Sequence, residues 1–348
     1  MLTPPHPRIL VRATNWVGDA VMSLPALQKI RERFPESHIA VLARPWVADI
    51  YARESFAGEV IPYTSPRGFH DLAGKWRVAQ DLRSRRFDIA ILLQNAFEAA
   101  ALVWAAGIPR RIGYDRDGRG WLLTDRIPPP RAGEIPRHEQ YYYLELLKRA
   151  GLLDKLPDSA TIRLSGSSGA AQRGIVSLRA AGLETPVIGI SPGAAYGTAK
   201  RWLPERFAEA AAELCREIGG CAALFGSADE RVLCDRIATE LREQGHRAHN
   251  FAGETSLSEY IELAAACRIY LTNDSGGMHI ASALGIPTVA VFGATDESAT
   301  GPTGDRARVV REPVECSPCL LRECPIDHRC MTRVTGERVA QTALELLK

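Results

Sequence analysis

With 348 residues, 46% of them hydrophobic and 24% charged, the chain has the size and composition of a soluble globular protein with two domains. Its apolar runs are only strand-length and its N-terminal segment lacks the apolar core of a signal peptide, so we expect a cytoplasmic protein without a transmembrane helix. The net charge is only +2, no nucleic-acid-binding signature is present, and the basic surplus lies in residues 1–165, with 24 Lys and Arg against 18 Asp and Glu.

The chain alternates short apolar strands with helices. In the first half, strands are expected at 8–13, 38–43, 59–62, 88–93 and 110–114, and helices at 20–33, 76–84, 97–106 and 138–150. A flexible joint is expected at 165–169, where the sequence is SGSSG. In the second half, strands are expected at 187–190, 222–226, 269–272 and 288–292, and helices at 204–218, 229–244, 258–266, 278–284 and 337–347.

This alternation predicts an α/β protein with two Rossmann-like domains, each a doubly wound parallel sheet, and a cleft between them. We place the domains at 1–165 and 166–348, and the terminal helix could pack back on the first domain. Neither half carries a G-x-G-x-x-G turn after its first strand, which argues against a dehydrogenase.

The most informative turn follows the strand at 269–272. Residues 273–277 read Asn-Asp-Ser-Gly-Gly, a cluster of cap and turn residues that leads into a short helix containing His279. A helix N-terminus at the carboxyl end of a parallel strand offers free backbone N–H groups to a phosphate, and the glycines allow a ligand to approach closely. A simply capped helix with a packed histidine would give the same pattern.

A second candidate loop follows the strand at 187–190. Residues 191–202 are rich in Gly and small side chains and then present Lys200 and Arg201. Such a loop suits a pyrophosphate, with the lysine as a point charge on the leaving group. Alternatively, it is a surface loop with two solvated cations.

Two acidic positions also follow strands. Asp19 lies where the loop after the first strand meets a helix, and it either caps that helix or takes a proton from an acceptor hydroxyl. Asp229 and Glu230 follow the strand at 222–226, and they either cap a helix or accept hydrogen bonds from ribose hydroxyls. We expect all four segments to converge on one cleft, with a nucleotide diphosphate held by the second domain.

Four of the eight cysteines are clustered as Cys316-x2-Cys319-x4-Cys324-x5-Cys330. In a reducing compartment this density suggests a Zn²⁺ ion or an Fe–S cluster, with His328 able to replace one thiolate. Reduced thiols or a redox-dependent disulfide are the alternatives. We expect a structural clip of the loop, because the chemistry that the candidate loops suggest needs no metal.

Five strings together resemble glycosyltransferase family 9, the bacterial lipopolysaccharide heptosyltransferases, over most of the chain. They are NWVGDAVMSLPAL (15–27), SPGAAYGTAKRWLPERFAEAA (191–211), LFGSADE (224–230), NFAGETSL (250–257) and TNDSGGMHIASALGIPTVAVFG (272–293). The resemblance implies the GT-B fold, an interdomain active site, and metal-independent transfer that inverts the anomeric carbon. It also implies ADP-L-glycero-D-manno-heptose as the donor and the first inner-core heptose on Kdo2-lipid A as the acceptor.

Carried over residue by residue, the resemblance makes Asp19 the general base and Lys200 the stabiliser of the departing ADP, with no cofactor required. It implies donor binding by Ala195, Tyr196, Glu230, Ala252, Gly253, Asp274, Ser275, Gly276, Gly277 and His279. Within this set, Glu230 or its neighbour Asp229 binds the ribose, and the loop at 252–253 lines the adenine.

The basic surplus of the first half would attract an anionic glycolipid acceptor, although an ordinary Arg-rich surface would have the same composition. Arg67, Arg110, Arg111 and Arg116 are candidate contacts, and we expect peripheral contact with the cytoplasmic face of the inner membrane. Three other interpretations stay open: heptosyltransferase I or another GT-B sugar transferase, a sugar-nucleotide 2-epimerase, and a non-catalytic binding protein.

Overall fold

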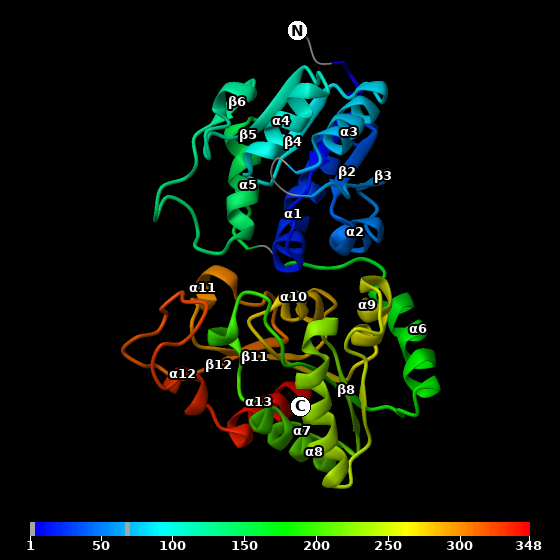
Figure 1. Ribbon diagram of the computed structural model, residues 1–348, viewed down its shortest axis with the longest axis vertical. Helices are drawn as coiled ribbons and strands as arrows, with labels where there is room; N and C mark the ends of the chain where they lie inside the picture. The colour runs from blue at the N-terminus through cyan, green and yellow to red at the C-terminus, as the bar shows by residue number, and fades with distance from the viewer. Residues whose placement is uncertain (1–3, 67–69, 160) are drawn as a thin grey trace. The chain divides into compact units, whose positions relative to one another are not determined.

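Each half of the chain forms one six-stranded parallel sheet flanked by helices (Figure 1). The computed structural model describes residues 4–66, 70–159 and 161–348, and the chain divides into unit 1, Met1–Ala160, and unit 2, Thr161–Lys348. The predicted α/β class with two doubly wound parallel sheets is confirmed.

Unit 1 is built on strands that are buried on both faces. Side chains of β1, β2 and β4 are buried along their whole length, which explains why these strands are apolar runs in the sequence, with Arg12 of β1 as the exception. The strands are β1 (Ile9–Arg12), β2 (Ile39–Ala43), β3 (Glu59–Pro62), β4 (Ile89–Leu92), β5 (Arg110–Tyr114) and β6 (Asp125–Ile127). The helices are α1 (Val17–Arg33), α2 (Pro45–Ala52), α3 (Leu72–Ser84), α4 (Phe97–Ala105), the 3₁₀ turn η1 (Gly120–Leu122) and α5 (Gln140–Arg149).

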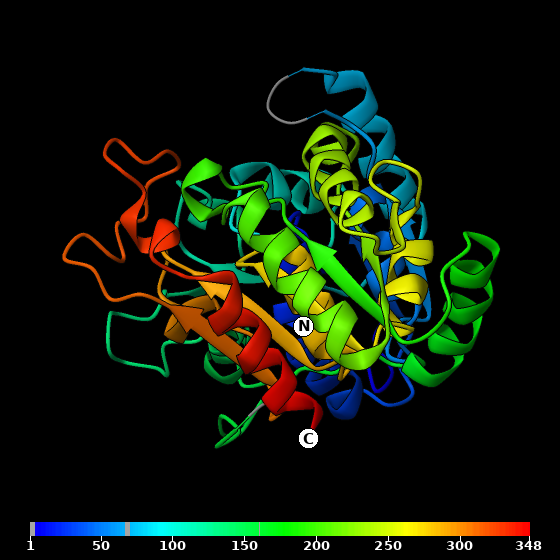
Figure 2. The same ribbon diagram turned by 90° about the horizontal axis from the view of Figure 1, so that it is seen from below.

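Unit 2 repeats the pattern. Its strands are β7 (Val187–Ser191), β8 (Cys221–Leu224), β9 (Ala248–Asn250), β10 (Ile269–Asn273), β11 (Thr288–Phe292) and β12 (Ala307–Arg311). Its helices are α6 (Ser167–Ala180), η2 (Thr198–Lys200), α7 (Pro204–Ile218), η3 (Ala228–Glu230), α8 (Arg231–Glu243), α9 (Leu257–Ala265), α10 (Gly276–Ala283), α11 (Glu297–Thr300), α12 (Arg329–Thr332) and α13 (Gly336–Leu347). The terminal helix α13 packs beside α7 and against β11 and β12 of its own unit (Figure 2).

The order of the strands reverses at the middle of each sheet. Sheet 1 runs β3-β2-β1-β4-β5-β6, and sheet 2 runs β12-β11-β10-β7-β8-β9. β1 therefore pairs with β4, and β7 pairs with β10, while the chain leaves each pair in opposite directions. Such a switch point opens a crevice beyond the carboxyl ends of the two strands, where ligands bind in open α/β sheets.

The SGSSG segment is a helix start and not the flexible joint that its composition predicts. Gly166 adopts a left-handed conformation (φ 69°), and α6 begins at the next residue and packs along α9. The helix-forming residues that follow the glycines explain the difference. Among the described residues, no helix combines the length and the apolarity that crossing a bilayer requires.

The close packing of α6 on α9 depends on Gly174. A Cβ atom at this position would lie 2.0 Å from the backbone oxygen of Glu262 on α9, so Gly174→Ala must push the helices apart. We expect a loss of about 1–3 kcal/mol in the free energy of unfolding, measured by guanidinium unfolding followed by circular dichroism. The matched control is Gly169→Ala on the exposed side of the same helix, which should leave stability unchanged or slightly raised. Equal midpoints for the two variants would contradict the packing argument.

Candidate functional site

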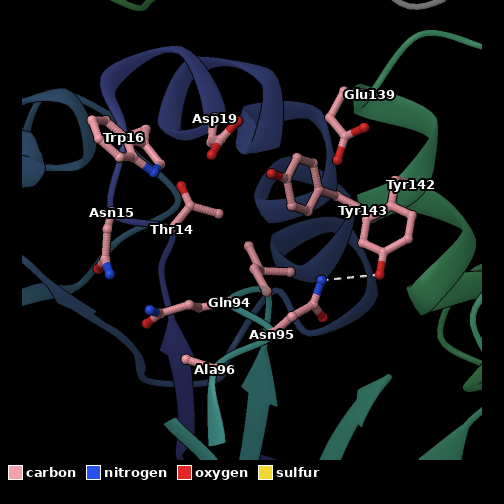
Figure 3. A pocket seen from close by; sticks show the side chains of 11 residues that line it. Thr14, Asn15, Trp16, Asp19, Gln94, Asn95, Ala96, Glu139, Tyr142 and Tyr143 are labelled. Atoms are coloured by element: carbon pink, nitrogen blue, oxygen red, sulfur yellow. Dashed lines mark hydrogen bonds between the residues drawn. The ribbon is translucent and has the colours of Figure 1, made fainter. Parts of the chain in front are cut away.

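A polar cavity of about 340 Å³ lies at the switch point of sheet 1 (Figure 3). Its lining residues are Thr14, Asn15, Trp16, Asp19, Leu93, Gln94, Asn95, Ala96, Glu139, Tyr142 and Tyr143. They come from the loop after β1, the start of α1, the loop after β4 and the first turn of α5. The volume lies within the range of roughly 300–1,000 Å³ that is usual for small-ligand pockets.

Asp19 projects into this cavity from the first turn of α1 (Figure 3). The N-cap position of α1 is occupied by Trp16, and Asp19 is the third residue of the helix. A carboxylate in the first turn of a helix is stabilised by the helix dipole. The Asp19 carboxylate is therefore positioned to contact a polar ligand in the cavity.

Two buried arginines hold the loops that form the cavity. Arg12 donates from Nη2 to Asn15 Oδ1 (3.2 Å) in the loop after β1. Arg119 donates from Nη2 to Asn95 Oδ1 (3.0 Å) and from Nε to the Tyr114 carbonyl (3.0 Å), which ties the loop after β4 to the end of β5. Burial lowers the pKa of each guanidinium to about 10, so both stay charged at neutral pH. The sequence analysis did not predict the supporting role of either arginine. For Arg12 the sequence did contain a signal, because an arginine within an apolar strand needs buried hydrogen-bond acceptors.

The predicted basic contacts of unit 1 differ in their surroundings. Arg110 forms an ion pair with an aspartate of β6, and Arg111 donates to backbone carbonyls, so both have structural partners in the fold. Arg116 is exposed and donates to the hydroxyl of Tyr142 (3.3 Å), which lines the cavity. Arg67 lies outside the described residues. Of the three described, Arg116 is thus the one that borders the cavity.

At the switch point of sheet 2, Lys200 and Asp274 form an ion pair. Lys200 Nζ lies 2.6 Å from Asp274 Oδ2, and both side chains are largely buried. Thr295 Oγ1 donates to the same carboxylate oxygen (2.6 Å). The structure therefore brings together the two loops that the sequence singled out, and it holds the ammonium group next to the start of α10.

Asn273 fixes the ends of the Lys200 loop. Its Nδ2 donates to the Pro192 carbonyl (2.7 Å), and its Oδ1 accepts from the backbone N–H of Trp202 (2.9 Å). Trp202 is itself buried, donates to the Val334 carbonyl (3.1 Å) and packs edge-on against Phe207. The loop that carries Lys200 is thus anchored at both ends in the core of unit 2, a role of Asn273 that the sequence did not suggest.

The other residues of the predicted donor turn face different ways. Ser275 is the N-cap of α10 and Gly276 its first residue, and both are partly exposed. A Cβ atom on Gly277 would lie 2.9 Å from Ser191 Oγ, so packing against β7 accounts for this glycine. His279 is buried. Ser275, Gly276 and Gly277 are therefore the partly exposed members of this turn.

Glu230 takes part in a capping box at the start of η3. Its Oε2 accepts from the backbone N–H of Ser227 (2.9 Å), and its carboxylate lies against Gly193 in the loop after β7. Ala252 is fully buried, and Gly253 has a positive φ of 76° that suits glycine. The capping role that the sequence allowed for Glu230 is present, and the carboxylate also borders the Lys200 loop.

Tyr196 connects the Lys200 loop to the cysteine-containing segment, residues 316–330. The Lys200 ammonium and the Arg322 guanidinium lie 4.9 Å and 5.1 Å from the centre of its ring, and its hydroxyl donates to the Leu320 carbonyl (2.8 Å). The backbone N–H of Ala199 donates to the Arg322 carbonyl (3.0 Å). Ala195 beside it is exposed. The cysteine-containing segment therefore supports the loop that presents Lys200.

The cysteine cluster does not have the arrangement of a metal site. Cys316, Cys319, Cys324 and Cys330 are free thiols, and throughout the described residues no group of three or more His, Cys, Asp or Glu side chains is placed to hold a metal ion. The Zn²⁺ or Fe–S prediction is therefore unsupported. Sequence spacing counts possible ligands, whereas a metal needs their sulfur atoms to converge. Burial, followed by the neighbouring thiols, raises the pKa of Cys330, so this side chain stays a neutral thiol.

Comparisons with known proteins identify the family of the chain. The family model of glycosyltransferase family 9 (heptosyltransferase) matches residues 75–329. The chain is 34% identical to lipopolysaccharide heptosyltransferase 2 of Escherichia coli over 87% of this chain and 88% of that protein, and 34% identical to the Salmonella typhimurium protein of the same name with the same coverage. The solved structure of E. coli ADP-heptose LPS heptosyltransferase II superposes with a TM-score of 0.83 at 31% identity and covers 98% of both chains.

The two Rossmann-like sheets and the superposition on E. coli heptosyltransferase II show the GT-B fold, as the sequence predicted. The chain belongs to glycosyltransferase family 9, the heptosyltransferases. It is therefore an enzyme that transfers a sugar, and a non-catalytic binding protein is excluded as its class.

The hydroxyl of Thr295 is predicted to stabilise unit 2 through Asp274. Thr295→Val removes a buried hydrogen bond to a charged group, so we expect the free energy of unfolding to fall by about 1.5–3 kcal/mol in guanidinium titrations. Thr300→Val is the matched control, because the buried Thr300 hydroxyl has no hydrogen-bond partner among the described residues. The control should be neutral or stabilising. A loss in the control as large as that in Thr295→Val would refute the role of this bond.

Proposed function

We propose that the protein transfers L-glycero-D-manno-heptose from ADP-heptose to the first heptose of the lipopolysaccharide inner core, as heptosyltransferase II. The observation that carries the proposal is the presence of Asp19 in a polar cavity and of Lys200 beside the start of α10, in a chain 34% identical to lipopolysaccharide heptosyltransferase 2. The reported relatives are all heptosyltransferases, which favours heptose transfer over sugar-nucleotide epimerisation.

Unit 2 binds the nucleotide in this proposal. The diphosphate meets the Lys200 ammonium and the free N–H groups at the start of α10, beside Ser275 and Gly276. An incoming phosphate competes with Asp274 for Lys200, so the ion pair holds the lysine in place until the donor arrives. Glu230 faces the ribose, and the loop at 252–253 borders the adenine.

Unit 1 supplies the base. The Asp19 carboxylate accepts the proton of the acceptor hydroxyl while that oxygen forms a bond to the anomeric carbon of the heptose. The bond from the anomeric carbon to the β-phosphate oxygen breaks at the same time, and its electron pair leaves with ADP. Attack opposite the leaving group inverts the anomeric centre. Lys200 and the helix N-terminus stabilise the negative charge that develops on ADP, so this step requires no metal ion.

Asp19→Ala and Lys200→Ala should separate the two roles. Asp19→Ala should lower transfer by about 10²-fold or more and leave ADP affinity within about twofold, because it removes the base alone. Lys200→Ala should weaken both ADP binding and turnover, because its charge acts on the diphosphate before and during departure. Transfer is followed by product mass with heptosyl-Kdo2-lipid A, and ADP binding by calorimetry. Near-wild-type transfer by Asp19→Ala would rule out the base assignment.

We also propose that unit 1 contacts the cytoplasmic face of the inner membrane, where a Kdo2-lipid A-type acceptor resides. Phe97, Trp104 and Trp121 are 38%, 52% and 61% exposed, and the Trp121 ring lies 6.2 Å from each of the other two. Exposed clusters of large apolar side chains mark interaction surfaces, and tryptophan favours the membrane interface. The basic surplus of the first half suits an anionic leaflet.

Vesicle binding tests this contact. The Trp104→Ser/Trp121→Ser double variant should bind phosphatidylglycerol-containing vesicles on the order of tenfold more weakly than wild type in co-sedimentation, because two apolar anchors are lost. Trp76→Ser is the matched control, since Trp76 is 56% exposed and belongs to α3 outside this cluster. Equal binding by the double variant and the control would contradict a membrane role for the cluster.

A further inference from the structure

The cavity of unit 1 contains a second carboxyl group that the mechanism above does not use. Glu139 occupies the N-cap position of α5, and its side chain lines the same cavity as Asp19 (Figure 3). In that view the ring of Tyr143 lies between the two carboxyl groups. Glu139 is partly buried and makes no side-chain capping bond to its own helix. Helix capping therefore does not account for its presence here.

The titratable groups around Glu139 come from three elements. Asp19 faces it from α1, and Arg116 faces it from the loop after β5. Tyr143, one turn further along α5, has a pKa raised well above its ordinary value by burial and by both carboxylates, so its hydroxyl stays neutral. The loop after β4 contributes only the neutral amides of Gln94 and Asn95 to the cavity. Asp19 and Arg116 are thus the charges that act on Glu139.

These surroundings place the titration of Glu139 near neutral pH. Burial, followed by the negative charge of Asp19, raises the pKa of Glu139 to about 7, while Arg116 acts in the opposite direction. The interaction between two carboxylates is reciprocal, because the same Coulomb energy acts on both protons. An ionised Glu139 therefore increases the affinity of Asp19 for a proton.

We propose that Glu139 is a positioning residue of the transfer reaction, which acts through Asp19: its negative charge across the cavity makes Asp19 a stronger base toward the acceptor hydroxyl. This inference rests on the proposed role of Asp19 as the base. It assigns to Glu139 no contact with the reacting atoms. The other residues that line the cavity are neutral, so Asp19 and Glu139 are its two carboxyl groups.

The sign of the pH dependence follows from the direction of the shift. Below its raised pKa Glu139 is protonated, and Asp19 feels no repulsion and is a weaker base. As the pH rises through about 7, Glu139 loses its proton and Asp19 becomes more basic. We therefore expect kcat/KM for the acceptor to increase as the pH rises through about 7, and this increase forms a limb of the pH profile.

Two variants move this limb in different ways. Glu139→Gln keeps the size of the side chain and removes its charge, so the limb near pH 7 should disappear and kcat/KM at pH 8 should fall about threefold or more. Arg116→Gln removes the cation that favours ionised Glu139, so its limb should shift to higher pH. Glu134→Gln is the control, because Glu134 is exposed and pairs with Arg149 away from the cavity. Its profile should match wild type.

The measurement is the pH profile of kcat/KM between pH 5.5 and 9, with ADP-heptose and heptosyl-Kdo2-lipid A, and with thermal unfolding recorded for every variant. A Glu139→Gln enzyme whose kcat/KM still rises near pH 7 overturns the proposal. An Arg116→Gln enzyme whose rise in kcat/KM stays at the wild-type pH also overturns it. The Arg116→Gln result decides the question if Glu139→Gln does not fold. If wild type transfers no heptose to either Kdo2-lipid A or its heptosylated form, the proposed function itself has failed. A flat profile in active wild type overturns only the role of Glu139.

Discussion

The site depends on the reversal of strand order at the middle of each sheet. β1 and β4 are neighbours in sheet 1, and β7 and β10 are neighbours in sheet 2, while their connections leave in opposite directions. The loops beyond these pairs cannot cover each other, which leaves an open crevice at the carboxyl edge of each sheet. The cavity with Asp19 occupies the first crevice, and the ion pair of Lys200 with Asp274 occupies the second.

The loops at these crevices are fixed by buried polar groups. In unit 1, the guanidinium groups of Arg12 and Arg119 each bind an asparagine side chain of a cavity loop. In unit 2, Asn273 anchors the Lys200 loop at both ends. Breaking such a buried contact leaves an unpaired polar group, which costs about 1–3 kcal/mol or more for a charged group. The loops are therefore rigid supports for the few groups that must act on a ligand.

Much of the fold could be predicted from the sequence because parallel strands buried on both faces are continuous apolar runs. β1 and β10 lie within one residue of the predicted ranges, whereas the edge strands β6, β9 and β12 carry mixed residues and were missed. The segment at 165–169 was misjudged because glycine and serine indicate both a loop and a helix start.

The candidate site could be predicted only in part, for a physical reason. Lys200 and Asp274 were found because each follows a strand, and position relative to a strand end is readable from the sequence. Arg119 and Glu139 were missed because their partners come from elements far away in the chain. The cysteine spacing predicted a metal site without support from the structure, since among the described residues no group of three or more possible ligands is placed to hold an ion.

The most direct measurement of the central claim is the mass of the product formed from ADP-heptose and two separate acceptors, Kdo2-lipid A and its mono-heptosylated form. Our account predicts that the purified protein adds one heptose to the mono-heptosylated acceptor and releases ADP, with little product from Kdo2-lipid A itself. Efficient transfer to Kdo2-lipid A alone would instead indicate heptosyltransferase I activity. Absence of transfer to both acceptors would contradict the account.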